Sequence, residues 1–126
     1  MKQYNIAVVV GSLRAESLNM QMAHAVARAA PAHFSFNIIS IADLPSYNQD
    51  EDYHQAEPVL ALKAAIATAQ GVLFVTPEYN RSIPGVLKNA IDHASRPYGQ
   101  SAWAGKPAGV MGVSIGAPGK IGRAHV

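Results

Sequence analysis

Four short apolar runs, separated by longer amphipathic stretches, dominate the pattern of hydrophobic and polar positions along the chain. Three of them, residues 6–10, 72–76 and 108–113, are almost continuously apolar. This pattern is typical of strands that are buried on both faces of a parallel sheet. The run at residues 34–39 partly alternates, as expected for an edge strand with one wetter face. The pattern therefore predicts four strands, one of them at an edge.

The amphipathic stretches between these runs carry helix signals. Ser17 is a good N-cap residue for the first stretch, and Pro58 lies in the first turn of the second. Gly71 is placed to end the second helix, and Pro97 follows the end of the third. The expected helices cover residues 17–30, 58–70 and about 82–95.

Strands and helices alternate along the chain, which implies right-handed crossovers and a parallel sheet with helices on both faces. We expect a doubly wound α/β sheet with the strand order 2-1-3-4(-5), in which the fifth strand and the last helix are missing. Residues 1–120 would form one incomplete domain, and its strand at 108–113 would keep a free, aggregation-prone edge. Residues 121–126 resemble a translated sequencing adapter and are interpreted as a non-native tail; a natural short tail is the alternative.

Composition and charge exclude several classes of protein. Hydrophobic residues make up 49% and charged residues 14% of the chain, which excludes a disordered protein. The net charge is only +2 and no basic cluster is present, which argues against nucleic-acid or membrane-surface binding. The chain has no cysteine, so disulfides, thiolate catalysis and cysteine-based zinc sites are excluded. The apolar runs are too short to span a membrane, and a cytoplasmic location is expected.

The segment between the first strand and the first helix carries several groups that suit a phosphate. A helix N-terminus offers free N–H groups and the positive end of its dipole. With one glycine, this segment lacks the three-glycine dinucleotide fingerprint, so a terminal phosphate fits better than a pyrophosphate. In the alternative interpretation, Ser17 merely caps the helix and Arg14 lies in solvent. The candidate phosphate ligands are Ser12, Arg14, Ser17 and Asn19.

A second candidate segment, residues 77–85, follows the third strand. In a 2-1-3-4-5 sheet the first and third strands flank the point where the winding reverses, so the segments that follow them form one ligand crevice. Tyr79 offers an aromatic face there, and main-chain amides could reach the edge of a planar ring. A simple turn that joins strand to helix is the alternative.

Both segments also carry a family resemblance. The residues Gly11-Ser-Leu-Arg14 with Ser17 and Asn19, then Pro77-Glu-Tyr-Asn80, Ser82-Ile-Pro-Gly85 and Leu87-Lys-Asn-Ala-Ile-Asp92, are similar to the motifs of the NADPH-dependent FMN reductase family. That family includes quinone, chromate and azo-dye reductases. The resemblance covers the chain to about Gly119.

The resemblance implies a flavodoxin-like fold, FMN as cofactor and NAD(P)H as co-substrate. It implies hydride transfer through FMN to a quinone-like or other small acceptor, and a homodimer or homotetramer whose interface involves residues 43–57 and the third helix. No side chain is expected to act as a catalytic acid or base, and no metal is expected. The implied phosphate ligands are Ser12, Arg14, Ser17 and Asn19, and the implied flavin-ring neighbours are Pro77, Glu78, Tyr79, Asn80, Ser114 and Gly116.

Two other functions compete with this prediction. Residues 112–116 match the G-x-S-x-G nucleophile elbow of α/β hydrolases, with Ser114 as nucleophile. However, no acidic residue follows Ser114, and His125 is the only later histidine. A flavin-binding or interaction domain without turnover is the second alternative.

A few further residues have weak signals. The acids at 50–52 could hold a cation but more often form a solvated run, and the histidines have no spacing that suits a metal. Trp103 is expected to serve packing or an interface.

Overall fold

The computed structural model describes residues 2–11, 18–76, 85–114 and 117–125, with the main chain alone from residue 113 onward. All four predicted strands form, and the wetter run at 34–39 lies at an edge of the sheet, as its alternating pattern predicts. These strands are β1 (Tyr4–Val10), β2 (Phe34–Ile39), β3 (Gly71–Val75) and β4 (Pro107–Ser114).

The four strands are parallel and stand in the order β2-β1-β3-β4, which confirms the predicted doubly wound arrangement. β1 is central, and its Val8 lies opposite Ile38 of β2 and Leu73 of β3. The side chains of Val8 and Val9 are fully buried, because strands covered by helices on both faces have no solvent-facing side.

A fifth strand, β5 (Ala117–His125), pairs with the outer edge of β4 in the antiparallel direction. Pro107 lies opposite His125 and Ser114 lies opposite Ala117. The expectation of a missing fifth strand and a free β4 edge is therefore wrong. Antiparallel neighbours need only a short turn, whereas a parallel strand needs a crossover of a dozen or more residues. The residues interpreted as a non-native tail lie within β5, apart from residue 126, which is outside the described residues.

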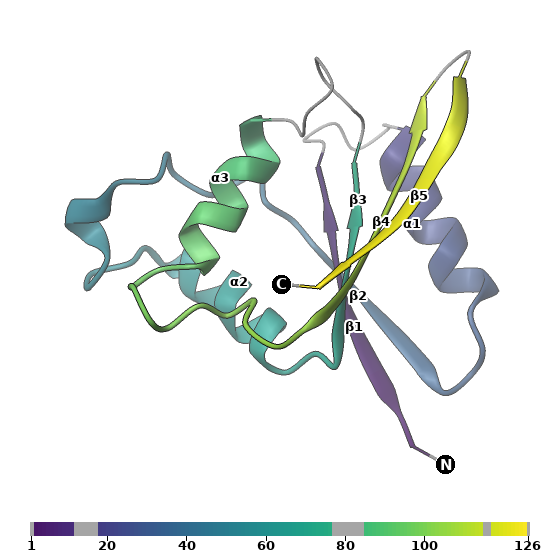
Figure 1. Cartoon of the computed structure of the whole chain (residues 1–126), viewed down its shortest axis with the longest axis horizontal. Coiled ribbons are helices and arrows are strands. Elements are labelled where there is room, and N and C mark those ends of the chain that lie inside the picture. Colours follow the sequence, from purple (N-terminus) through teal and green to yellow (C-terminus); the bar gives the residue numbers. More distant parts are fainter. Residues whose placement is uncertain (1, 12–17, 77–84, 115–116, 126) are drawn as a thin grey trace.

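In the part of the chain that the structure describes, three α-helices are present, and they cover the two faces of the sheet (Figure 1). They are α1 (Leu18–Ala29) on one face, and α2 (Glu57–Ala67) and α3 (Gly85–Ala94) on the other. The expectation that Gly71 ends the second helix is wrong, because Gly71 is the first residue of β3. The helix ends earlier, where the Thr68 N–H and hydroxyl both donate to the carbonyl oxygen of Ala64.

The core has two layers, one on each face of the sheet. The layer under α2 and α3 is the larger; Leu62 and Leu87 are buried there, and Trp103 packs on Phe74. The indole Nε1 of Trp103 donates to the Ile91 carbonyl oxygen at 3.0 Å, so its polar atom is satisfied inside the core. The layer under α1 is built from Val8, Val10, Ala23 and Val75, with partly buried neighbours.

The long segment at residues 43–57 is irregular, as predicted, apart from the short 3₁₀ helix η1 (Gln49–Glu51) and Glu57, the first residue of α2. Side chains of α3 attach it to the rest of the fold. The Asn89 Nδ2 donates to the Pro45 carbonyl oxygen at 2.9 Å, and its Oδ1 accepts from the Tyr47 N–H at 2.8 Å. The buried His93 donates from Nε2 to the same Pro45 oxygen at 2.7 Å.

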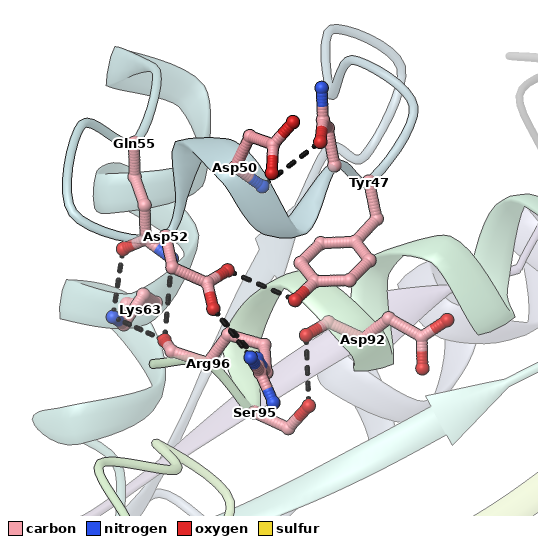
Figure 2. A network of polar contacts seen from close by, with 9 residues as sticks. Tyr47, Asp50, Asp52, Gln55, Lys63, Asp92, Ser95 and Arg96 are labelled. Atoms are coloured by element: carbon pink, nitrogen blue, oxygen red, sulfur yellow. Dashed lines mark hydrogen bonds and ion pairs between the residues drawn. The ribbon is translucent and has the colours of Figure 1, made fainter. Parts of the chain in front are cut away.

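A second attachment joins this segment to the residues that follow α3 (Figure 2). Arg96 donates from Nε and Nη2 to one oxygen of Asp52 at 2.9 and 2.7 Å, and Tyr47 donates to the other at 2.9 Å. The Arg96 hydrogen bonds hold the pKa of the Asp52 carboxyl below its usual value, and burial raises the pKa of Tyr47. Lys63 of α2 donates to the Arg96 carbonyl oxygen at 2.8 Å.

The acids at 50–52 therefore do not behave as either interpretation expects. Asp50 and Glu51 are exposed, but Asp52 is buried and ion-paired. Within the ranges that the structure describes, no group of histidine and acidic side chains could hold a metal ion. The acidic run is a structural contact at its last position and a solvated surface at the other two.

Candidate functional site

The carboxyl ends of β1, β3 and β4 lie side by side at one edge of the sheet. The chain leaves β1 toward β2 on one side and returns to β3 on the other, so the winding reverses between β1 and β3. Ligands of doubly wound proteins bind in the crevice at this point. The two segments singled out in the sequence, residues 11–19 and 77–85, follow these strand ends, and their residues 12–17 and 77–84 lie outside the described residues.

Thr76 lies at the centre of this edge, directly after the last residue of β3. Its N–H donates to the Met111 carbonyl oxygen at 2.9 Å, and the Gly11 N–H donates to the Val75 carbonyl oxygen at 2.8 Å. Thr76 is 8% exposed. The hydrogen bonding of the sheet thus continues one residue beyond β1 and β3, so the edge is well defined up to the start of the candidate segments.

Two glycines leave room for Thr76. A Cβ atom added to Gly11 would lie 2.5 Å from the Thr76 Oγ1, and one added to Gly112 would overlap the Thr76 carbonyl oxygen. Neither glycine has a left-handed backbone, so any side chain is excluded there by close packing and not by conformation. Such packing is typical of a position where two stretches of backbone approach each other closely.

Asn19 is the one predicted ligand whose side chain the structure describes. It lies in the first turn of α1 and is 4% exposed. Its Oδ1 is 3.8 Å from the position that a Cβ of Gly112 would take. The start of α1 thus lies close to the end of β4 at Asn19.

The other predicted ligands are placed only in part. Ser114 is the last residue of β4, and its main chain lies opposite Ala117. The remaining predicted ligands lie outside the described residues, so their roles stay predictions; they are Ser12, Arg14, Ser17, Pro77, Glu78, Tyr79, Asn80 and Gly116.

The hydrolase alternative does not fit the described main chain. A nucleophile elbow is a sharp turn between a strand and a helix. After residues 112–116 the chain continues as the strand β5 and not as a helix. The alternative of Ser114 as the nucleophile of an α/β hydrolase is therefore wrong.

Thr76 is not among the residues predicted for the site, because in the sequence it looks like an ordinary strand end. The signal that could have revealed it is the pair of glycines at the ends of the first and fourth strands. In the predicted sheet, both of these strands are neighbours of the third. A small residue on each side of Thr76 indicates a close approach there.

Comparison with known proteins agrees with this architecture. Residues 4–125 match the NADPH-dependent FMN reductase family. The chain is 57% identical over 122 residues to a 2-hydroxy-1,4-benzoquinone reductase of a Burkholderia species, covering 96% of this chain and 67% of the relative. It is 54% identical over 123 residues to a quinone reductase of Pseudomonas putida, covering 97% of this chain and 66% of that relative.

A solved structure agrees as well. The flavoenzyme FerB of Paracoccus denitrificans, an NAD(P)H:(acceptor) oxidoreductase, superposes with a TM-score of 0.85 at 50% identity, over 90% of this chain and 62% of FerB. The chain belongs to the NADPH-dependent FMN reductase family and has its flavodoxin-like fold. It spans about two thirds of the length of these relatives.

Proposed function

We propose that this chain binds FMN at the carboxyl edge of β1, β3 and β4 and takes part in the NAD(P)H-dependent reduction of a quinone-like or other small acceptor. The observation that carries the proposal is the edge itself. It lies where the winding reverses, and its chain ends lead into both segments that carry the family motifs. Residues 1–120 would be the FMN-binding domain.

The donor set suits the phosphate of FMN. Two hydroxyls, a guanidinium and an amide can all donate to phosphate oxygens, and the guanidinium adds a charge-assisted bond. The segment 12–17 leads directly into α1, a 12-residue helix whose N-terminal N–H groups favour an anion. The residues proposed to hold the phosphate are Ser12, Arg14, Ser17 and Asn19.

The flavin ring would lie against the segments that follow β3 and β4. When bound, FMN supplies the redox chemistry, taking a hydride from NAD(P)H and passing electrons to the acceptor. The protein supplies binding, orientation and the shape of the site, so no side chain is assigned as an acid or base. The proposed ring neighbours are Pro77, Glu78, Tyr79, Asn80, Ser114 and Gly116.

The names of the relatives support the class of acceptor. Two relatives that are more than half identical to this chain are named as reductases of quinones. A quinone is planar, and it could approach the face of a bound flavin without a dedicated acid or base. The alternative, a flavin-binding domain without turnover, is tested by the assay below.

We further propose a homodimer or homotetramer and a cytoplasmic location. The side chains of Tyr53, Leu60 and Tyr98 are 79%, 51% and 88% exposed, which makes them candidates for burial between subunits. The α3 face that carries Asn89 and His93 is already covered by residues 45–47 of the same chain. No helix among the described residues has the length and apolar character needed to cross a bilayer. Sedimentation that shows only monomer would contradict the assembly.

The test of the proposed function is oxidation of NADPH by the FMN-loaded protein, followed at the absorbance of NADPH with and without 1,4-benzoquinone. We expect oxidation that depends on both FMN and the quinone. In Arg14→Ala, loss of a charge-assisted hydrogen bond should weaken FMN binding by about 10- to 150-fold and leave riboflavin binding nearly unchanged. FMN binding without quinone-dependent turnover would favour the non-catalytic alternative, and equal losses for FMN and riboflavin would refute the role of Arg14.

A further inference from the structure

Thr76 occupies the space between Gly11 and Gly112, at the edge where the proposed flavin segments begin. We infer that Thr76 is a positioning residue of this site: it sets the distances between the ends of β1, β3 and β4 and thereby orients the segments that hold FMN. The inference rests on the proposed function, because it needs a flavin at this edge. It does not require Thr76 to touch the flavin.

On the β1 side, the contact is made by the Thr76 side chain. A Cβ atom added to Gly11 would lie 2.5 Å from the Oγ1 of Thr76 and 2.8 Å from the Cβ of Thr76. Cβ atoms in real proteins do not come this close to other atoms. The same Cβ would lie 3.3 Å from Cδ2 of Leu87, which is 1% exposed and belongs to α3. The Thr76 side chain therefore takes the space in which a Gly11 side chain would lie, and Leu87 closes that space from the α3 side.

On the β4 side, the contact is made by the main chain of Thr76. Its carbonyl oxygen packs against Gly112, and its N–H donates to Met111 at 2.9 Å. The Asn19 Oδ1 comes close to the same point of β4 from the first turn of α1. One residue thus touches β1 with its side chain and β4 with its backbone, beside the start of α1.

Every proposed flavin segment begins close to this contact in the sequence. Ser12 follows Gly11 directly, Pro77 follows Thr76 directly, and Ser114 is two residues beyond Gly112. Protein interiors are packed densely enough to transmit small displacements. A shift of about 1 Å at Thr76 would displace the ends of β1, β3 and β4, where the proposed cofactor-binding segments start, and misplacement of this size can change binding and rate by about two orders of magnitude.

The experiment uses glycine substitutions with a matched control. Gly11→Ala and Gly112→Ala introduce the two clashes, whereas Gly109→Ala lies on the same strand as Gly112 and makes only an ordinary contact, 3.5 Å from Leu73 Cδ1. FMN affinity is measured by quenching of flavin fluorescence, and the setting of the ring by visible circular dichroism. We expect the first two variants to bind FMN about 10- to 100-fold more weakly and the control to match the wild type.

A double substitution separates the two sides of Thr76. Thr76→Gly removes the atoms that clash with Gly11→Ala, so the double variant should bind FMN more tightly than Gly11→Ala alone. The same change should not improve Gly112→Ala, because the clash there is with a main-chain oxygen that every residue has. The inference would be overturned if the effects of Thr76→Gly and Gly11→Ala on FMN affinity were additive. It would also be overturned if Thr76→Gly restored FMN affinity equally in Gly11→Ala and Gly112→Ala.

Milder variants keep the test valid if the clashing variants do not fold. Thr76→Ser keeps the Oγ1 and should behave as the wild type, whereas Thr76→Ala should weaken FMN binding and change the visible circular dichroism of the bound flavin. If Thr76→Ala only lowers the melting temperature and leaves affinity and spectrum unchanged, Thr76 is a packing residue and the inference fails. If the wild type binds no FMN, both the proposed function and the positioning role fail. If the wild type binds FMN and the variants bind it with the same affinity and the same visible circular dichroism, only the positioning role is refuted.

Discussion

Asn89→Ala is expected to loosen the attachment of residues 43–57 to α3. The Asn89 side chain makes two hydrogen bonds across this contact, to the Pro45 carbonyl oxygen and from the Tyr47 N–H. The Pro45 oxygen keeps a partner in the variant, because His93 also donates to it. The Tyr47 N–H loses the partner that Asn89 provides, so the main cost is one unsatisfied main-chain donor.

The magnitude follows from these two effects. Leaving the part-buried Tyr47 N–H without a partner costs about 1–3 kcal/mol, and the better helix propensity of alanine returns about 0.5 kcal/mol. We therefore expect the free energy of unfolding to fall by about 0.5–2.5 kcal/mol, measured by urea denaturation of the FMN-free protein with an unchanged slope.

The matched control for this prediction is Lys88→Ala, on the neighbouring residue of α3. The Lys88 side chain is 61% exposed and makes a surface ion pair with Asp92. Such a pair contributes about 0.3–0.5 kcal/mol. If Asn89→Ala is no less stable than Lys88→Ala, the described hydrogen bonds do not hold residues 43–57 in place.

Two further predictions concern the free energy of unfolding, one for the buried face of α2 and one for the ion pair of Asp52. Leu62→Ala should lower the free energy of unfolding by about 2–5 kcal/mol, because Leu62 is 1% exposed. Leu60→Ala in the same helix should lower it far less, because Leu60 is 51% exposed. Equal losses would contradict the assignment of the buried face of α2. The fold lowers the pKa of Asp52. Its carboxylate therefore stabilises the protein fully at pH values above the ordinary aspartate pKa of about 4, and this stabilisation is lost as the pH falls through the lowered pKa of Asp52 in the folded protein. The stability difference between wild type and Asp52→Asn, measured by urea denaturation from pH 7 to pH 3, should therefore shrink with acidification, and a constant difference would argue against the Arg96 ion pair as its cause.

The strands and helices of this fold could largely be predicted from the sequence. Residues that are buried on both faces of a parallel sheet form nearly unbroken apolar runs, and the one wetter run marked the edge strand correctly. Neither the existence nor the antiparallel direction of β5 was predicted, because residues 117–125 lack an apolar run and pair through the main chain of β4.

The site could be predicted at the level of topology but not of packing. The strand order alone brings the ends of β1 and β3 together, so the location of the site follows from the alternation of elements. The role of Thr76 depends on main-chain approach within a few ångströms, and the burial of Asp52 depends on Arg96, which is 44 residues away in sequence. Neither contact leaves a local pattern in the chain.

Flavin binding at this sheet edge can be measured by titrating the FMN-free protein with FMN and following the quenching of flavin fluorescence, with riboflavin titrated in parallel. We expect saturable binding of one FMN per chain and weaker binding of riboflavin, because riboflavin lacks the phosphate that the segment before α1 is proposed to hold. Equal affinity for the two flavins would contradict the phosphate site, and the absence of saturable FMN binding would show that this sheet edge is not a flavin site.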